Sequence, residues 1–72
     1  MENHIRVLRA MKGVSQQEVA DAVGVRVQTI NHIENNKYGP SLLLGLRIAL
    51  YFGVPVDKIF FLDDEDRNIK MD

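Results

Sequence analysis

Apolar residues recur every three or four positions along most of the chain, which is the spacing of one face of an α-helix. The first such segment predicts a helix from about Asn3 to Lys12, and Gly13 follows its end. The residues expected on its inward face are Ile5, Leu8 and Met11. Glycine tolerates the left-handed backbone that ends many helices, so this helix is expected to stop at Lys12.

The second segment opens with a capping signal. In the stretch SQQE, the Ser15 hydroxyl can accept from the backbone N–H of Glu18, while the Glu18 carboxylate accepts from the N–H of Ser15. This helix is predicted to end at Val23, because Gly24 suits a left-handed C-cap. A third helix begins only a few residues later, near Val27.

The third helix is predicted to end at about Asn35, with Ile30 and Ile33 facing inward. The following stretch NKYGPS contains adjacent glycine and proline and therefore predicts a loop, with Ser41 as the next N-cap. A fourth helix over residues 42–52 is apolar almost all round. Its expected core stripe is Leu42, Gly45, Ile48, Ala49 and Phe52.

Pro55 suits the first turn of a short fifth helix that ends at Phe60, and no strand of useful length is evident. The pattern therefore predicts an all-α fold, a compact five-helix bundle that forms one domain over residues 1–62. An acidic C-terminal tail over residues 63–72 follows, with too little apolar surface to order itself alone.

Charge is distributed unevenly along the chain, whose formal net charge is −1. Residues 1–62 hold seven Lys or Arg against five Asp or Glu, whereas residues 63–72 hold two against five. A mildly basic body with an acidic tail permits a nucleic-acid partner without demanding one.

Composition narrows the classes of protein. The chain has no cysteine, which excludes disulfides and thiolate metal ligands and suits a cytoplasmic protein. The apolar run over residues 42–46 is too short to cross a membrane, and the N-terminus lacks a secretory signal. Neither His4 nor His32 has an acid partner at helical spacing, and DDEDRN lacks the glycine and closing glutamate of a calcium loop. We therefore expect no enzyme activity, no cofactor and no metal.

Two helices joined through a few residues that include a glycine are typical of a helix-turn-helix. The chain resembles the Cro/phage-repressor (XRE-type) family of helix-turn-helix transcriptional regulators, in its short single-domain form. The resemblance covers residues 3–60 and rests on the order and spacing of IRVLR, GVSQQEVA, VGV, QTINHIEN, KYGPSL, RIA and FGVPVDKIF.

The resemblance implies that the third helix, Val27 to Glu34, is the recognition helix and lies in the major groove of double-stranded DNA. The residues that it assigns to base edges are Val27, Gln28, Asn31 and His32. Their chemistry agrees, because an amide can pair with adenine, a methyl can pack on thymine and an imidazole can donate to guanine. The alternative is that these side chains only form a solvated helix face.

Phosphate contacts are implied for a second set of residues, which are Gln16, Gln17, Arg26, Thr29, Asn36, Lys37 and Tyr38. Gln16 and Gln17 open the second helix, where free N–H groups and the helix dipole favour an anion. Arg26 departs from the family, which usually has Ser or Thr as the N-cap there. Losing that cap costs about 1 kcal/mol, and an arginine contact to a phosphate would compensate.

Relatives use the positions of Arg9 and Glu34 for a partly buried ion pair that fixes the angle of the third helix; the alternative is two independently solvated charges. Surplus apolar residues in the fourth helix and in the stretch IFFL predict a homodimer. The residues expected at its interface are Leu44, Tyr51, Phe61 and Leu62.

The sequence as a whole predicts a sequence-specific regulator of transcription, a repressor that binds an inverted-repeat operator as a homodimer. A second function stays open, because the same fold serves in toxin–antitoxin pairs as a DNA-binding antitoxin or as a protein-interaction module. In that case the acidic tail would cover a basic toxin surface.

Overall fold

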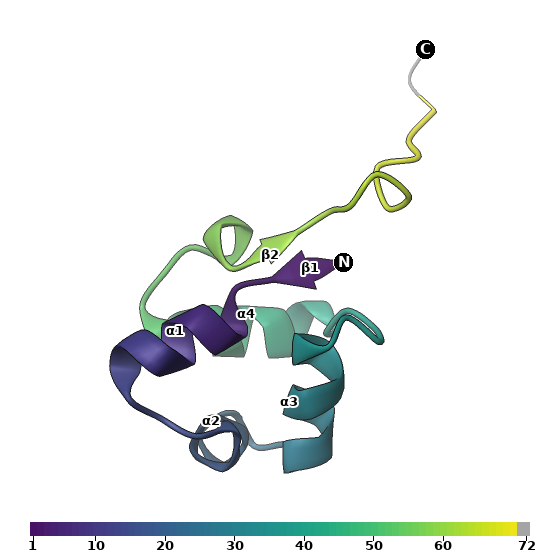
Figure 1. Cartoon of the computed structure of the whole chain (residues 1–72). Coiled ribbons are helices and arrows are strands. Elements are labelled where there is room, and N and C mark those ends of the chain that lie inside the picture. Colours follow the sequence, from purple (N-terminus) through teal and green to yellow (C-terminus); the bar gives the residue numbers. More distant parts are fainter. Residues whose placement is uncertain (71–72) are drawn as a thin grey trace.

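The computed structural model describes residues 1–70 of the chain; residues 71–72 of the predicted tail lie outside the described residues. Helices surround a single core, and the residues after the last strand extend away from it (Figure 1). The elements in chain order are β1 (Glu2–Asn3), α1 (Ile5–Lys12), α2 (Gln16–Val23), α3 (Val27–Glu34), α4 (Leu42–Phe52), the 3₁₀ turn η1 (Val56–Lys58) and β2 (Phe60–Phe61).

The core is built mainly from branched aliphatic side chains that all four α-helices and the residue before β2 contribute. Its buried members are Ile5, Val19, Ala20, Val23, Ile30, Ile33, Ile48, Ala49 and Ile59. Each isoleucine or valine removed from water stabilises the fold by about 1.5–3 kcal/mol. Because Ile30 and Ile33 belong to this core, one face of α3 is fixed and the opposite face is turned outward.

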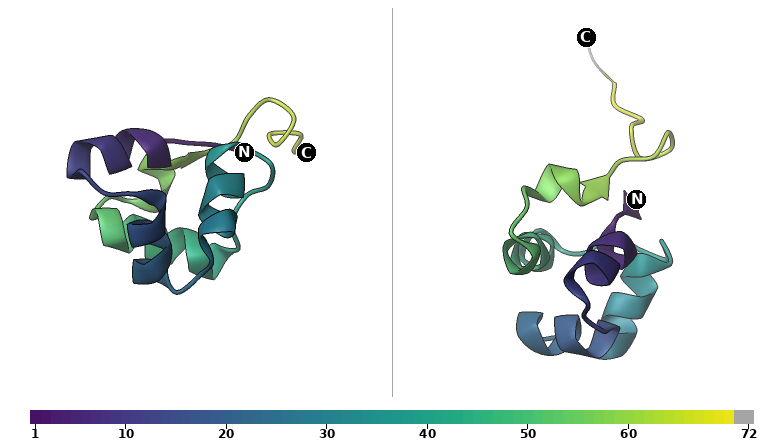
Figure 2. Two further views of the ribbon diagram at one scale, coloured as in Figure 1. Left: turned by 60° about the horizontal axis from the view of Figure 1, so that its bottom comes forward. Right: turned by 60° about the vertical axis from the view of Figure 1, so that its left-hand side comes forward.

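The connection between α2 and α3 follows the sequence prediction. Ser15 Oγ accepts from Glu18 N at 3.0 Å, and Glu18 Oε1 accepts from Ser15 N at 3.2 Å, which completes the capping box. Gly24 ends α2 with φ 79°, in the left-handed region that favours glycine. The chain therefore turns sharply between α2 and α3, at the end of the molecule opposite the strands (Figure 2).

Two short strands replace the ends of the predicted first and fifth helices. β1 and β2 pair antiparallel, with Glu2 opposite Phe61 and Asn3 opposite Phe60. The first helix begins at Ile5, because the Asn3 backbone belongs to this ladder while its Oδ1 accepts from Ile5 N at 3.1 Å. The sequence analysis expected no strand of useful length, and each of these two strands has only two residues.

The predicted five-helix count was also wrong. The described residues contain four α-helices. The 3₁₀ turn Val56–Lys58 follows α4 and stands where the fifth helix was expected. The backbone of Phe60 cannot continue a helix there because it pairs with β1. A short apolar run cannot distinguish a helix from a strand by its periodicity alone.

The core face of α4 is narrower than its sequence suggested. Gly45, Ile48 and Ala49 are buried, whereas Leu42 is 77% exposed. Leu42 borders an open apolar hollow of about 270 Å³ above Gly45, so no neighbouring side chain covers it. Among residues 1–70, no helix has both the length and the apolar character that a bilayer crossing requires.

Candidate nucleic-acid interface

The outward face of α3 is polar and slightly hollowed. Gln28 and Asn31 are exposed, and Val27 and His32 are half-buried. These four side chains line a shallow depression of about 230 Å³ together with Gln16, the first residue of α2. The residues predicted to read bases therefore share one surface. This surface lies on the side of α3 opposite the buried residues Ile30 and Ile33.

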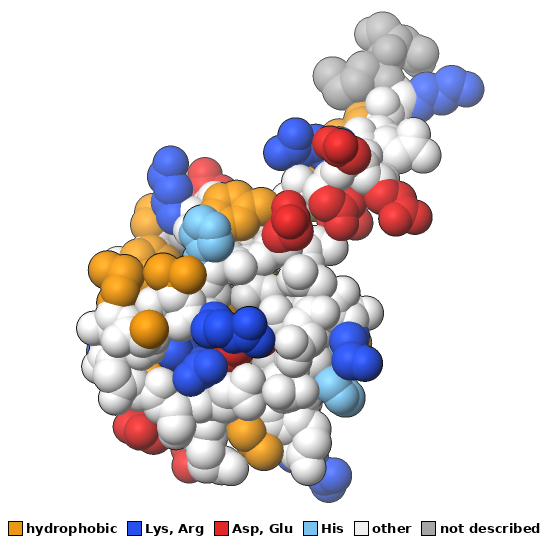
Figure 3. Space-filling view, viewed as in Figure 1, with side chains coloured by type: hydrophobic (Ala, Val, Ile, Leu, Met, Phe, Trp, Pro, Cys, Tyr) orange, Lys and Arg blue, Asp and Glu red, His pale blue; other side chains and the backbone are white. Residues whose placement is uncertain are grey.

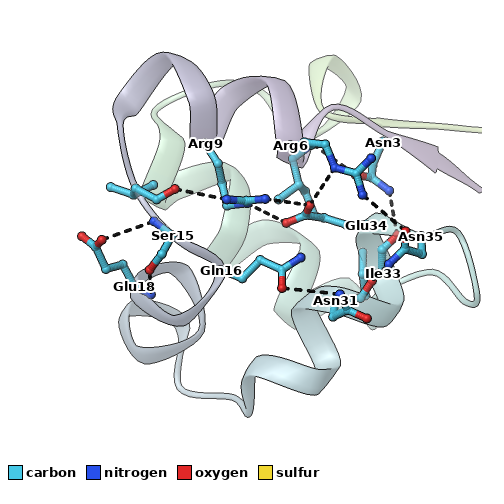
Figure 4. A network of polar contacts seen from close by, with 12 residues as sticks. Asn3, Arg6, Arg9, Ser15, Gln16, Glu18, Asn31, Ile33, Glu34 and Asn35 are labelled. Atoms are coloured by element: carbon cyan, nitrogen blue, oxygen red, sulfur yellow. Dashed lines mark hydrogen bonds and ion pairs between the residues drawn. The ribbon is translucent and has the colours of Figure 1, made fainter.

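Gln16 lies among the predicted base readers, although the sequence assigned it to a phosphate. Asn31 Nδ2 lies 3.5 Å from Gln16 Oε1 and donates to it (Figure 4). The depression thus combines amide donors and acceptors with an imidazole and a valine methyl group. Such groups match the hydrogen-bonding edges and the thymine methyl group that the major groove presents.

The predicted phosphate-contacting residues are spread over the start of α2, the start of α3 and the loop that follows α3. Arg26 is exposed and precedes α3, while Lys37 is exposed and follows it. Thr29 is half-buried within the helix. Gln17 is exposed, but its Nε2 donates to Asp21 Oδ1 at 2.8 Å, so a carboxylate lies where a phosphate contact was expected.

Arg26 is the N-cap residue of α3 and makes no side-chain capping hydrogen bond. The missing cap is expected from the sequence, which has arginine where the family usually has Ser or Thr, because a guanidinium cannot accept from a backbone N–H. The first turn of α3 consequently keeps N–H groups without a side-chain acceptor from residue 26. A helix start of this kind attracts an anionic oxygen.

The loop after α3 has a defined path. Asn36 has φ 59°, a left-handed conformation that asparagine tolerates better than most residues. Lys37 N donates to His32 O at 3.0 Å, which closes the loop onto the last turn of α3. Asn3 Nδ2 donates to Ile33 O at 2.8 Å and to Asn36 Oδ1 at 3.1 Å, so β1 tethers the loop to the rest of the domain.

Arg9 and Glu34 join α1 to the end of α3. Arg9 Nε donates to Glu34 Oε2 at 2.7 Å and Arg9 Nη2 to Glu34 Oε1 at 3.1 Å, while Nη1 donates to Val14 O at 3.2 Å (Figure 4). The Glu34 side chain is fully buried and that of Arg9 is 18% exposed. The hydrogen bonds that Arg9 donates to Glu34 are the main cause that raises the pKa of Arg9, so the pair favours the charged guanidinium.

Sequence reasoning missed Asn3 and Arg6 at this junction. Arg6 Nε lies 3.5 Å from Glu34 Oε1, and Arg6 Nη2 donates to Asn35 Oδ1 at 3.3 Å. Arg6 precedes Arg9 by three residues and therefore shares its helix face, which is a signal that the sequence offered. Asn3 offered none, because its position depends on the pairing of β1 with β2.

The acidic tail is folded back at its base. Asp66 N donates to Asp63 Oδ1 at 2.8 Å, and the Met1 ammonium group contacts Asp66 Oδ2 at 2.9 Å and Asp63 Oδ2 at 3.3 Å. Figure 3 shows acidic side chains gathered along the tail, apart from the Lys and Arg side chains near the middle of the body. The negative charge is therefore spatially separated from much of the basic charge.

The residues predicted at the dimer interface are less exposed than four leucines of α4 that were not predicted there. Leu44 and Tyr51 are half-buried and pack against the core, Phe61 is half-buried, and Leu62 is 42% exposed. The most exposed apolar side chains of α4 are Leu42, Leu43, Leu46 and Leu50, at 77%, 60%, 47% and 82%. They form an apolar face directed away from the core, which we call the leucine face.

Comparison with known proteins places this geometry in context. A family model described as helix-turn-helix matches residues 5–59. An uncharacterized HTH-type transcriptional regulator from Methanocaldococcus jannaschii is 41% identical over 66 residues, covering 92% of this chain and 100% of that relative. The regulator YgzD from Bacillus subtilis has the same identity and coverage.

Two more distant similarities involve longer proteins. The cryptic phage CTXphi transcriptional repressor RstR from Vibrio cholerae is 32% identical over 65 residues, which cover 90% of this chain and 57% of RstR. The crystal structure of a transcriptional regulator from Listeria innocua superimposes with a TM-score of 0.68 at 18% identity, covering 79% of this chain and 57% of that one. The structural likeness supports the fold alone.

Proposed function

The chain belongs to the XRE/Cro-C1 type of helix-turn-helix transcriptional regulators, a non-enzymatic DNA-binding class, and we propose that it is a repressor that binds an inverted-repeat operator as a homodimer. In this proposal α3 enters the major groove of each half-site. The observation that carries it is the polar depression on α3, opposite the face that Ile30 and Ile33 anchor in the core.

Base reading is assigned to Val27, Gln28, Asn31 and His32. Gln28 is the strongest candidate, because it is exposed and its amide makes no hydrogen bond to another described side chain. An amide of this kind can pair with N6 and N7 of adenine in two hydrogen bonds. Gln16 supports Asn31 from the edge of the depression.

Phosphate contacts are assigned to residues at the two ends of α3 and at the start of α2. Arg26 and Lys37 bring positive charge to opposite ends of the recognition helix, and both are exposed. The further members of the set are Gln16, Gln17, Thr29, Asn36 and Tyr38. Contacts of this type set the register and orientation of the protein without reading sequence.

The homodimer is supported by the leucine face. Leu43 and Leu50 lie three residues before and four residues after Leu46 on the same helix face. If two α4 helices approach antiparallel across a twofold axis, Leu43 of each copy meets Leu50 of the other, and both Leu46 side chains lie near the axis. We therefore centre the interface here and place Leu44, Tyr51, Phe61 and Leu62 around it.

Repression is proposed because RstR, a relative over nearly the whole of this chain, is a transcriptional repressor. Occupancy of a promoter by the bound homodimer is the proposed mode of action. Twofold symmetry would present two α3 helices to one face of the duplex, so the proposal expects half-sites about 34 Å apart along it.

The test is selection of binding sites from a random duplex library with the purified chain, followed by affinity measurements on the enriched site. The proposal predicts a palindrome whose half-site centres are one helical turn apart. In the same selection, the variant Gln28→Ala changes an exposed side chain and should lose enrichment at one symmetric pair of positions. Enrichment of a single unsymmetric half-site would contradict the homodimer, and no enrichment would favour a protein-interaction role.

A further inference from the structure

Tyr38 lies against the one imidazole in the depression on α3. The ring centroids of His32 and Tyr38 are 5.8 Å apart and the ring planes meet at 75°, an edge-to-face arrangement. Aromatic pairs prefer this geometry because the positive edge of one ring faces the negative face of the other. His32 is half-buried and Tyr38 is 47% exposed, so the contact lies at the rim of the surface.

The backbone delivers Tyr38 to this position. The hydrogen bond from Lys37 N to His32 O returns the chain to the last turn of α3, and the left-handed Asn36 makes that return possible. Asn3 then fixes Asn36 through its side-chain amide. The loop that carries Tyr38 is thus held by these hydrogen bonds, which places the Tyr38 ring against His32.

An imidazole reads a base only if its ring points in the right direction. A partly exposed histidine on a helix can occupy several rotamers, which turn its two ring nitrogens, Nδ1 and Nε2, in different directions. A ring packed on one side removes some of these rotamers before DNA arrives. Such preorganisation reduces the entropy lost on binding and sharpens discrimination between bases.

We propose that Tyr38 is a positioning residue for His32, which holds the imidazole in its reading orientation and so sets base preference at the position that His32 faces. The inference rests on the proposed function, in which His32 reads a base. It differs from the phosphate role assigned to Tyr38, because that role needs the hydroxyl group, whereas packing on His32 needs the aromatic ring.

Two substitutions separate the ring from the hydroxyl group. Tyr38→Phe keeps the ring and should leave base preference at the His32 position unchanged, even if affinity for all sequences falls. Tyr38→Leu keeps apolar bulk but removes the ring, and it should relax preference at that position by about two- to tenfold. In a His32→Ala background, Tyr38→Leu should cause no additional loss of preference.

Proton chemical shifts of the His32 ring in the free protein give a readout that is independent of DNA. Tyr38→Leu should move these shifts toward those of an unstacked imidazole, and Tyr38→Phe should not. If the shifts respond but Tyr38→Leu leaves base preference intact, the ring pair does not position a reader and the inference is overturned. If His32→Ala itself changes no base preference while the protein still selects its palindrome, this inference fails and the proposed function stands.

Discussion

Arg9 of α1 and Glu34 at the end of α3 form an ion pair with two hydrogen bonds, and the Glu34 carboxylate is fully buried. The pair connects the helix that opens the domain to the helix that we propose reads DNA. Because burial makes each charge dependent on the other, we propose that the pair fixes the angle of α3.

Arg9→Met should lower the free energy of unfolding by about 3 kcal/mol, since it leaves a buried carboxylate without its main partner. Arg6→Met is the matched control, because Arg6 is on the same helix and near the same carboxylate but is 68% exposed. Its cost should be within about 1 kcal/mol. Urea titration measures both, and equal losses would contradict the special role of Arg9.

Arg26→Ser should stabilise the fold and weaken DNA binding at once. Serine supplies the missing N-cap of α3, worth about 1 kcal/mol, but removes a charge proposed to contact a phosphate. Thermal unfolding and affinity measurements on the selected operator check the two effects. Ser15→Ala, which removes the observed cap of α2, should lose about as much stability as Arg26→Ser gains. An unchanged affinity of Arg26→Ser would remove Arg26 from the phosphate set.

Gln28→Ala and Lys37→Ala should weaken binding in different ways. Gln28→Ala should lose about 1–3 kcal/mol on the best site and relax preference at one symmetric pair of positions, with little change in salt dependence. Lys37→Ala should weaken binding to all sequences and flatten the slope of log K against log salt by about one unit per lost contact. Affinities on single-position operator variants at several salt concentrations decide this. The reverse result would mean that α3 does not lie in the groove as proposed.

Leu46→Glu should convert the proposed homodimer to monomers, because it places two like charges near the twofold axis of an apolar contact. Sedimentation velocity at several protein concentrations measures the change, with circular dichroism to show that the fold is kept. Val7→Glu is the control, since Val7 is 55% exposed on α1 and lies outside the leucine face. An oligomeric state equally sensitive to both substitutions would move the interface away from α4.

Attachment of the acidic tail should depend on pH. The hydrogen bond with Asp66 is the main cause that raises the pKa of the Met1 ammonium group above its ordinary value of 8.0. Its contribution is therefore complete below pH 8 and is lost as the pH rises through the higher folded value. Amide shifts of residues 63–67 should follow this titration.

At acidic pH the same contact should be lost as the pH falls, which is the opposite pH dependence. The backbone hydrogen bond from Asp66 is the main cause that lowers the pKa of Asp63 below its ordinary 3.8. Its contribution is present above that value and is lost as the pH falls through the lower folded value. Acetylation of the Met1 amine should abolish the alkaline transition and leave the acidic one; an alkaline transition that survives acetylation would assign it to another group.

Much of the helical frame could be predicted because its signals are local. The capping box at Ser15 and the glycine at position 24 fix the bounds of α2 without help from the rest of the chain. The outward face of α3 could be predicted for a similar reason, since Ile30 and Ile33 identify the inward one. Local signals also marked the missing cap at Arg26.

What could not be predicted depends on pairs that are distant in sequence. The strands exist only because residues 2–3 meet residues 60–61 across the whole domain, and neither segment is long enough to show alternation. The tether from Asn3 to the loop after α3 follows from that meeting. The place of Gln16 in the depression also could not be predicted, because its hydrogen-bond partner Asn31 belongs to another helix.

The residues that hold α3 in place and the residues that we propose to read DNA are largely different sets. The last turn of α3 is anchored by Asn3, Arg6 and Arg9, whereas Val27 is the one proposed base reader that packs against the core. Exchanging residues 28, 31 and 32 should therefore cost little folding energy. The scaffold is a suitable starting point for engineering regulators that recognise new operators, and natural descendants could diverge in target while keeping the same frame.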